Sequence, residues 1–482
     1  MPFLSFNFAI FLGLALLLFH LAPARIRPRL LLILSYLYYL TWSPTYTMLL
    51  LAVTAGVYAT GLWIERSRTE HGKRAWMAIG VMLLLLLLFA FKAAASSLGD
   101  FLLPSRSGGS VAALLVVPLG LSYYVFRMVG YLLDVYWELL PAQRSFTLLA
   151  LYGSFFPQIV SGPIQRAQSF FEQTGKIENP GADDFLLGAR RILFGLFKKV
   201  AIADPLAILV ANVHANPSAF SSLELLMGAY CFSIQLYADF SAITDIAIGI
   251  GLLFGVRGPE NFDLPYFSPN ILAFWRRWHA SLTTWLADYL FTPLRMALRR
   301  WGNAGLCLAI FINMIAIGLW HGFTATFLAF GVLHGIYVSV SALSLKRRDL
   351  FFKNRATFAR LRMFAAPLLI FHLVVFSHIF FRAETFHSAL AYLSGLIPRW
   401  HPAAIPPMRC DASLLGLSAP GLVLCGVAFL VSEVVTWMAR QRIWSEWFVT
   451  TPILFRRALY CALLVAVLFL YKGSVTFIYA QF

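Results

Sequence analysis

The stretch WMAIGVMLLLLLLFAF, residues 76–91, contains no charged side chain and decides the class of fold. Residues 3–22, 413–437 and 458–471 are nearly as apolar. A helix needs about 20 mostly apolar residues to cross the hydrocarbon core of a bilayer, and these runs approach or reach that length. None of them alternates apolar and polar residues as barrel strands do. We therefore expect an all-α integral membrane protein, built as a multi-pass helical bundle.

The composition of the whole chain agrees with a membrane protein. Of its 482 residues, 60% are hydrophobic and only 12% are charged, whereas soluble domains are about 45–50% apolar and about 25% charged. The sequence has no repeat at a solenoid period, no low-complexity tract and no long polar linker. We therefore expect one domain that spans residues 1–482.

The formal net charge of +17 comes from lysines and arginines gathered in short clusters between the apolar runs. Such clusters are typical of cytoplasmic loops and do not by themselves indicate nucleic-acid binding. We expect the clusters within residues 25–29, 66–74, 346–362 and 440–457 to be cytoplasmic. Residues 30–64 would then cross twice and turn near TWSPT, which follows Leu40. Counting passes predicts roughly 11–13 membrane segments and places both termini outside the cytoplasm.

Residues 183–301 differ from the rest because they mix charged and aromatic residues at helical spacing. In GARRILFGLFKKVAIAD, residues 188–204, pairs of cations interrupt the apolar face. That pattern is typical of a helix that lies at the membrane interface or packs inside a bundle.

The first segment with intramembrane polar groups is QLYADFSAITD, residues 235–245. Gln235 and Asp239 are four residues apart and share a helix face, and Asp245 follows further along. Charged groups at membrane depth are costly, so they normally face a cavity or an ionic partner. Two interpretations stay open: structural pairing with a nearby arginine, or a functional role.

The second segment is FWRRWHASLTTWLADYL, residues 274–290. On one continuous helix, three large side chains share one side: Trp275, Trp278 and His279. Arg276 and Arg277 point away from the centre of that side. Tryptophan and arginine are typical of an interfacial anchor, but the same residue types also bind an anionic, pyrophosphate-bearing donor. Both interpretations stay open.

The third segment is GLWHGF, residues 318–323, which places His321 between two apolar runs. Gly318 and Gly322 flank the imidazole and lack side chains, so a substrate chain or another helix can approach closely. Imidazole is the usual general base for a hydroxyl near neutral pH. The alternative is a hydrogen-bonded histidine of the bundle with no catalytic role.

Other sites receive little support from the sequence. His334, His372 and His378 lie within apolar runs, and each fits a hydrogen-bonded residue of the bundle. The five cysteines are scattered and form no C-x-x-C pair, so we expect neither a metal site nor a disulfide framework. No H-E-x-x-H, no G-x-S-x-G and no phosphate-cradling glycine loop occurs. Metalloprotease, redox, lipase and nucleotide-hydrolysing functions therefore lack support.

The motifs that characterise this chain occur in order over nearly its whole length: VPLGLSYYVFRMVGYLLDVY (117–136), SFFPQIVSGPIQR (154–166), FKKVAIAD (197–204), YADFSAITDIAIG (237–249), FWRRWHASLTTWLADYL (274–290), GLWHG (318–322), FFRAET (380–385) and FIYAQF (477–482). Together they resemble the membrane-bound O-acyltransferase family, in particular its bacterial branch of alginate O-acetylation proteins.

This resemblance implies a helical bundle around a central tunnel, in which an essential histidine meets the acyl donor. The family's two histidines correspond to His321 and, upstream, to His279. A further set of residues is implied to bind the donor or line the tunnel: Trp275, Arg276, Arg277, Trp278, Trp320, Asp239, Asp245 and Gln235. The donor would be acetyl-CoA or another acyl thioester, with no bound cofactor and no metal.

The resemblance also implies an activity. The protein would be an O-acetyltransferase of the bacterial inner membrane that moves an acetyl group from a cytoplasmic thioester across the membrane. The acceptor would be an extracytoplasmic polysaccharide such as alginate, cellulose or another exopolysaccharide. The expected partners are an extracytoplasmic hydrolase-like protein that completes the transfer, a polysaccharide synthase or export complex, and membrane lipids, but no nucleic acid.

Some positions depart from the alginate branch. Ala238, Ala242 and Ile243 stand where that branch usually shows an aromatic residue, a glycine and a tyrosine, and TPLRMALRR, residues 292–300, lacks the usual glycine pair. Transfer of D-alanyl groups, or of acyl groups to peptidoglycan, by the same fold therefore stays open. A non-catalytic exporter is a further alternative, although the chain shows no repeated halves. A catalytically silent scaffold is disfavoured by the presence of both histidines.

Overall fold

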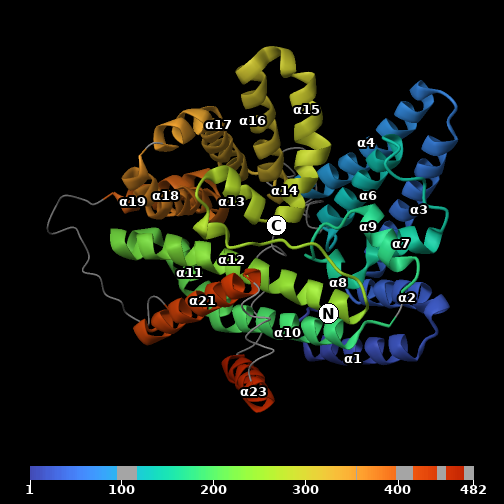
Figure 1. Ribbon diagram of the computed structural model, residues 1–482, viewed down its shortest axis with the longest axis horizontal. Helices are drawn as coiled ribbons and strands as arrows, with labels where there is room; N and C mark the ends of the chain where they lie inside the picture. Colours follow the sequence, from blue (N-terminus) through green and yellow to red (C-terminus); the bar gives the residue numbers. More distant parts are fainter. Residues whose placement is uncertain (95–116, 178, 354, 398–415, 442–451, 472–482) are drawn as a thin grey trace, which may run out of the picture. The chain divides into compact units, whose positions relative to one another are not determined.

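The computed structural model describes most of the chain: residues 1–94, 117–177, 179–353, 355–397, 416–441 and 452–471. Within these ranges the regular structure is entirely helical (Figure 1). Seven helical stretches of the described chain are long and apolar enough to cross a membrane: Pro44–Arg66, Glu70–Ala94, Ser222–Leu253, Arg299–His321, Ala325–Lys353, Arg360–Arg382 and Ala419–Arg440. The expected all-α, multi-pass membrane fold is confirmed. The roughly 11–13 segments stay a prediction, because shorter apolar helices occur as well.

The chain divides into two compact units. The first contains Met1–Ile192 and Ile243–Glu260, and the second contains Leu193–Ala242 and Asn261–Phe482. The chain passes from one unit to the other within α10, within α12 and again between Glu260 and Asn261. A single domain over residues 1–482 stays a prediction.

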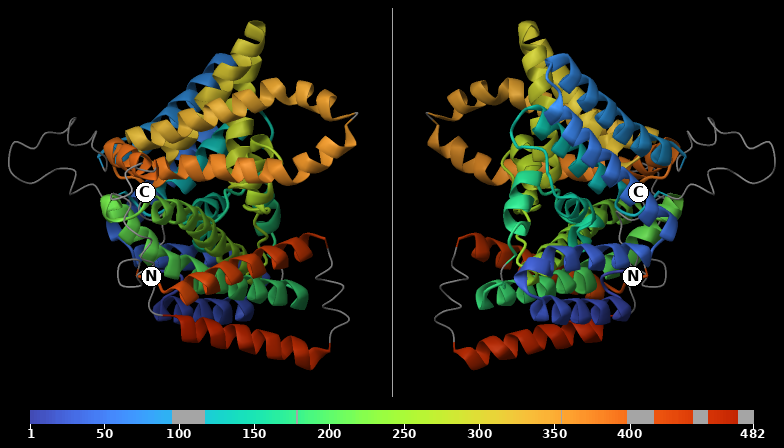
Figure 2. Two further views of the ribbon diagram at one scale, coloured as in Figure 1. Left: turned by 90° about the vertical axis from the view of Figure 1, so that its left-hand side faces the viewer. Right: turned by 90° about the vertical axis from the view of Figure 1, so that its right-hand side faces the viewer.

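The first unit contains the N-terminal helices: α1 (Phe6–Leu21), η1 (Ala24–Ile26), α2 (Arg27–Leu40), α3 (Pro44–Arg66), α4 (Glu70–Ala94), α6 (Leu121–Tyr136), α7 (Phe146–Ser154), α8 (Phe156–Ile159), α9 (Ala167–Thr174) and most of α10 (Ala182–Lys198). In it, α3, α4 and α6 pack against one another (Figure 2).

The second unit contains the remaining elements: the π-helix η3 (Lys199–Ala203), α11 (Asp204–Ala215), η4 (Pro217–Ala219), most of α12 (Ser222–Leu253), η5 (Pro265–Phe267), α13 (Ile271–Arg277), α14 (Ala280–Leu286), the π-helix η6 (Ala287–Phe291), α15 (Thr292–Ala297), η7 (Arg299–Trp301), α16 (Gly302–His321), α17 (Ala325–Lys353), α18 (Ala356–Arg382), α19 (Phe386–Leu396), α21 (Ala419–Arg440) and α23 (Ile453–Leu470). Here α17 packs against both α16 and α18 (Figure 2).

Local sequence explains where the first long helices begin and end. The turn expected at residues 41–45 separates α2 from α3. Ser43 caps α3 by accepting a hydrogen bond from the Tyr46 backbone N–H at 3.3 Å. Pro44 occupies the first position of α3, where its missing N–H costs nothing. The terminal motif at residues 477–482 lies outside the described residues.

A buried arginine joins three short helices of the first unit. The Arg127 guanidinium on α6 donates to the Tyr152 carbonyl at 3.0 Å, to Gln158 Oε1 at 2.8 Å and to the Pro163 carbonyl at 3.1 Å. Because a buried cation must be hydrogen-bonded, these contacts fix α7 and α8 against α6. They explain why the motif at residues 154–166 contains a polar glutamine.

The polar helix α12 is the most enclosed of the candidate spans. Its apolar part is fully buried, whereas most of the apolar part of α21 is not. The acidic residues of α12 therefore face protein and not lipid. The segment at residues 188–204, expected as one interfacial or packed helix, forms the end of α10, the π-helix η3 and the first residue of α11.

Candidate active site

The segment at residues 274–290 does not form the continuous helix that its sequence suggests, and this prediction is wrong. Helix α13 ends at Arg277, Trp278 is extended, and α14 begins at Ala280. Between them His279 adopts a left-handed conformation with φ 44° and ψ 50°. Such a backbone is strained for a residue with a side chain.

Backbone contacts compensate this strain. The Ala280 N–H donates to the Asn261 carbonyl at 2.9 Å, and the Asp263 N–H donates to the Arg277 carbonyl at 3.0 Å. These two bonds tie the break to the extended segment before η5. The break turns the His279 ring in a direction that a continuous helix would not give it, and strained residues of this kind cluster at functional sites.

The His279 ring is held in a single tautomer by Asn261. Asn261 Oδ1 accepts from the Ser281 backbone N–H at 3.1 Å and from the Ser281 hydroxyl at 2.7 Å. The same oxygen lies 3.2 Å from His279 Nδ1, which must therefore donate. The basic lone pair is then on Nε2. Burial lowers the pKa of His279 to about 3, so the ring is neutral at physiological pH.

His321 is the last residue of α16 and is also buried, with 5% of its surface exposed. Its ring packs among aromatic side chains, 4.7 Å from the Phe381 ring and 5.8 Å from the Phe327 ring. The Trp320 ring lies 4.8 Å from His321 and 5.6 Å from His279. The structure therefore brings the two predicted histidines to one indole, from segments that are about 40 residues apart in the chain.

The glycines beside His321 serve helix packing. A Cβ at Gly318 would lie 2.3 Å from the Phe327 carbonyl oxygen, and one at Gly322 would lie 2.8 Å from the Phe327 ring. Of the two uses expected for these glycines, the structure shows the close approach of another helix, α17. Because neither glycine has a side chain, Phe327 can reach the His321 ring.

Trp275 and Trp278 are both buried and contact other histidines. Trp275 Nε1 donates to His334 Nδ1 at 3.2 Å, and His334 Nε2 lies 2.9 Å from Ser377 Oγ. Both nitrogens of His334 are therefore engaged, which leaves no basic atom for catalysis. The Trp278 ring lies 5.8 Å from the ring of His378.

One ring nitrogen of His378 also has a hydrogen-bond partner. Its Nδ1 lies 3.0 Å from Ser233 Oγ, which itself donates to the Ala229 carbonyl at 3.1 Å. His378 Nδ1 is therefore the donor of this pair. This is the single hydrogen-bond partner that a buried structural imidazole needs.

Arg276 and Arg277 point away from the buried tryptophans, as expected. Arg276 is exposed, and Arg277 is partly buried with its guanidinium 3.4 Å from the Phe267 carbonyl. The described structure does not place either guanidinium in contact with the histidines. Their role at a donor site stays a prediction.

Asp239 forms an ion pair in the second unit, although its partner is a lysine and not an arginine. Lys199 Nζ lies 2.8 Å from Asp239 Oδ1 and 2.7 Å from Asp204 Oδ1. Burial lowers the pKa of Lys199, but the two carboxylates more than offset this effect, and the net change is upward. Burial raises the pKa of Asp204 to about 6, against the opposing effect of Lys199. Gln235 is buried on the same helix, and its Oε1 has no partner among the described residues.

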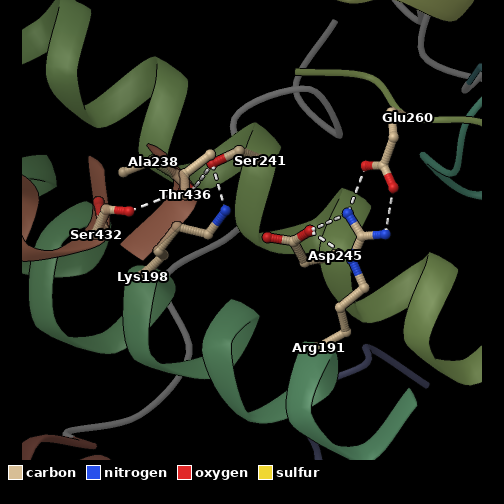
Figure 3. Close-up of polar contacts among 8 residues, drawn as sticks. All are labelled: Arg191, Lys198, Ala238, Ser241, Asp245, Glu260, Ser432 and Thr436. Atoms are coloured by element: carbon tan, nitrogen blue, oxygen red, sulfur yellow. Dashed lines mark hydrogen bonds and ion pairs between the residues drawn. The ribbon is translucent and has the colours of Figure 1, made fainter. Parts of the chain in front are cut away.

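Asp245 pairs with an arginine in the first unit. Arg191 donates from Nε and Nη2 to Asp245 Oδ1 at 3.2 and 3.1 Å, and its guanidinium also binds both oxygens of Glu260 (Figure 3). Beside α12, Lys198 Nζ donates to Ser241 Oγ at 2.9 Å (Figure 3). These contacts fit the structural interpretation of Asp239 and Asp245, whereas their role in a tunnel stays a prediction.

The sequence did not single out Asn261, Lys199 or Asp204. Asn261 lies 18 residues before His279 in the chain, and no local pattern indicates that it orients an imidazole. For Lys199, the signal available was a cation within an apolar run that needs an acidic partner. Among the described residues, no group of three or more metal-binding side chains lies together.

Comparison with known proteins decides the family. The family model for the membrane-bound O-acyltransferases matches residues 138–380, a region that contains both His279 and His321. The probable alginate O-acetylase of Pseudomonas syringae pv. tomato is 36% identical over 395 residues, which cover 80% of this chain and 72% of that protein. The chain belongs to the membrane-bound O-acyltransferase family. As a member of this family, the protein is an enzyme that transfers acyl groups at a membrane.

Other relatives in this family carry different names. The peptidoglycan O-acetyltransferase of Helicobacter pylori is 33% identical over 402 residues, covering 77% of this chain and 74% of that protein. The teichoic acid D-alanyltransferase of Bacillus subtilis is 29% identical over 280 residues, covering 56% of this chain and 69% of that protein. These membrane-bound O-acyltransferases differ in the acyl group or polymer that they are named for, so family membership alone does not select one substrate.

Proposed function

We propose that this enzyme takes an acetyl group from a thioester donor at the cytoplasmic side and passes it across the bacterial inner membrane, for O-acetylation of an extracytoplasmic polysaccharide. The observation that carries the proposal is that His279 and His321 both contact Trp320, among buried aromatic side chains. The donor is acetyl-CoA or another acyl thioester.

In this proposal His321 is the general base. Its imidazole takes the proton from the accepting hydroxyl, whose oxygen forms a bond to the thioester carbonyl carbon. The carbon–sulfur bond then breaks, and the proton passes from the imidazolium to the departing thiolate, so that His321 returns to its neutral form. Positioned proton transfer of this kind typically accelerates a reaction by about 10² to 10⁴-fold.

His279 has a supporting role. Because Asn261 holds its Nδ1–H, its Nε2 presents a lone pair of fixed direction, which accepts a hydrogen bond from a water that in turn donates to the oxygen of the accepting hydroxyl. The low pKa of His279 keeps the ring neutral, so no second cation repels the imidazolium that forms at His321. The burial of both rings protects the activated thioester from hydrolysis.

The relatives support a polymer as the acceptor. Alginate, peptidoglycan and teichoic acid appear in their names, and the first two names state O-acetylation. The match to an alginate relative covers as much as 89% of this chain. We therefore place an exopolysaccharide first, with alginate, cellulose or a related polymer as the substrate.

Delivery to the polymer requires partners in this proposal. We infer an extracytoplasmic hydrolase-like protein that accepts the acetyl group and completes the transfer, beside a polysaccharide synthase or export complex. Most of the described residues lie in helices joined by short connections, which leaves little surface to hold a long polymer.

A deletion strain tests the proposal. Mass spectrometry of its exopolysaccharide should show loss of O-acetyl groups, with polymer length and sugar composition unchanged. In a reconstituted system, the purified protein with acetyl-CoA should acetylate polymer weakly alone and efficiently after addition of the extracytoplasmic partner. Unchanged acetylation in the deletion strain would exclude the polysaccharide role, and full activity without a partner would remove the relay.

The second candidate is transfer to peptidoglycan, or of D-alanyl groups, by the same site. It is favoured by the relatives from H. pylori and B. subtilis. The same deletion strain distinguishes it, because muropeptide analysis would then show loss of O-acetyl groups while the exopolysaccharide stays unchanged. Loss of ester-linked D-alanine from the cell envelope would instead indicate D-alanyl transfer.

A further inference from the structure

Asn313 lies in the middle of α16 and is a buried polar residue. Neither the packing of the helix nor the two histidines explain why a polar side chain is buried there. Only 6% of its surface is exposed. Its Oδ1 is fully buried and accepts no hydrogen bond from any of the described residues. Buried acceptors are nearly always satisfied in native proteins, so an orphaned one indicates a missing ligand or water. In a membrane helix, such a residue normally faces a cavity or a substrate path.

From its position on α16, the Asn313 side chain faces neither α17 nor lipid. One side of α16 packs closely against α17, since a Cβ at Gly331 of α17 would lie 2.8 Å from the Met314 carbonyl. A second side carries the exposed apolar residues Leu308 and Ile312, which suit lipid. Asn313 lies on the remaining, buried side. The orphaned oxygen therefore does not face lipid or the α17 interface.

The same buried side of α16 leads to the candidate active site. Trp320 follows Asn313 by seven residues, which is about two turns, so the two side chains share a face. The Trp320 ring contacts both His279 and His321. Asn313 thus lies about 10 Å along the helix from the residue at which the histidines meet.

Asn313 lies on the donor side of the histidines. Arg299 and Arg300 immediately precede α16, so the positive-inside pattern places this end of the helix at the cytoplasm. In the proposed function, the thioester enters from that side. A donor whose thioester reaches His321 therefore extends its arm back past Asn313.

The chemistry of Asn313 fits one feature of that arm. A pantetheine thioester carries two amide groups at roughly 4 to 9 Å from its sulfur, by peptide-like bond lengths. An amide N–H is the donor that Asn313 Oδ1 lacks, and the asparagine NH₂ group donates in return to an amide carbonyl. We propose that Asn313 hydrogen-bonds an amide of the pantetheine arm and so selects pantetheine thioesters as donors. This inference rests on the proposed function.

The experiment compares two unreactive thioether analogues by calorimetry on purified protein in detergent. One is the thioether analogue of S-acetyl-pantetheine, and the other has the same chain length with both amides replaced by methylene groups. The variant is Asn313→Leu, which keeps the size of the side chain. The control is Asn303→Leu, at an exposed position of the same helix.

Asn313→Leu should raise the Kd of the amide-containing analogue by about 2- to 10-fold, the range of one neutral hydrogen bond. It should leave the Kd of the amide-free analogue unchanged or lower, and Asn303→Leu should change neither. Equal Kd values for the amide analogue in wild type and variant would overturn the inference. Equal weakening of both analogues would also overturn the inference, because it indicates a distorted site or a bound water. So would a wild-type protein that binds neither analogue.

Turnover of S-acetyl-pantetheine by the wild-type protein separates this inference from the proposed function. Amide-dependent binding that requires Asn313, without any acyl transfer, would refute the proposed reaction and keep the binding role. If the wild-type protein transfers acyl groups but Asn313→Leu changes the Kd of both analogues equally, only the binding role is refuted.

Discussion

Asn261 and His279 show how one contact determines a protonation state. Asn261 Oδ1 fixes the His279 proton on Nδ1, and burial keeps the pKa of the ring near 3. Lowering the pH from about 8 to about 5 therefore leaves His279 neutral, because its pKa lies below that range. Any loss of wild-type activity in this range must come from another group.

The substitution Asn261→Asp tests this assignment. A carboxylate at the same position still accepts from the Ser281 N–H and from His279 Nδ1, but its charge favours the imidazolium and raises the pKa of His279. We expect a new decline in activity on the acid side, below about pH 6, with near-normal activity at about pH 8. The measurement is acetyl transfer as a function of pH. Superimposable profiles of wild type and variant would show that His279 does not act in its neutral form.

At the scale of elements, the crossing of α16 and α17 positions the His321 ring. Gly318→Ala places a methyl group against the Phe327 backbone carbonyl, which cannot move without shifting α17. Overpacking of this kind costs about 1 to 3 kcal/mol. We therefore expect a lower unfolding temperature in detergent for Gly318→Ala.

The matched control for Gly318→Ala is Gly426→Ala. Gly426 lies on α21 with nothing within 4 Å of its missing Cβ, so Gly426→Ala should not destabilise the protein. Gly322→Ala meets only the movable Phe327 ring and should fall between the two. Equal unfolding temperatures for Gly318→Ala and wild type would contradict the close helix contact.

The π-helix η3 places Lys199 between two acidic residues, and the three should behave as a unit. Lys199→Met leaves the Asp204 and Asp239 carboxylates buried without the cation that joins them, which costs about 3 to 5 kcal/mol. Asp239→Asn keeps the pair of Lys199 with Asp204 at 2.7 Å and should cost less. The unfolding temperatures of the two variants show which substitution is more destabilising. A larger loss for Asp239→Asn would show that Lys199 does not hold the cluster together.

The positive clusters predict the orientation of the whole chain in the membrane. We expect both termini outside the cytoplasm and the loop at residues 346–362 inside it. Reporter fusions at the C-terminus and within this loop decide the orientation. A C-terminal fusion that is active only as a cytoplasmic reporter would overturn the pass count, and with it the side from which the donor enters.

The sequence predicted the helical membrane fold and the family because both depend on local signals. Long apolar runs give spans, and the histidine motifs stand in order along the chain. It missed the break at His279, since the spacing of Trp275 and Trp278 is compatible with a helix and the break depends on the distant Asn261. It also gave no sign that Trp275 donates to the distant His334, and the place of Trp275 at a donor site stays a prediction. Contacts between distant segments leave no periodic signal in the sequence.

The proposed mechanism depends on His321 as the general base. The most direct test is the acetyl content of the polysaccharide made by a His321→Ala strain, normalised to folded protein measured by size-exclusion profile. We expect a loss of about 10² to 10⁴-fold with a near-normal amount of folded protein. His378→Ala, the structural control, should lose acetylation only in proportion to lost folded protein. Near-normal acetylation by His321→Ala, or a loss that merely follows its folded protein, would contradict the mechanism.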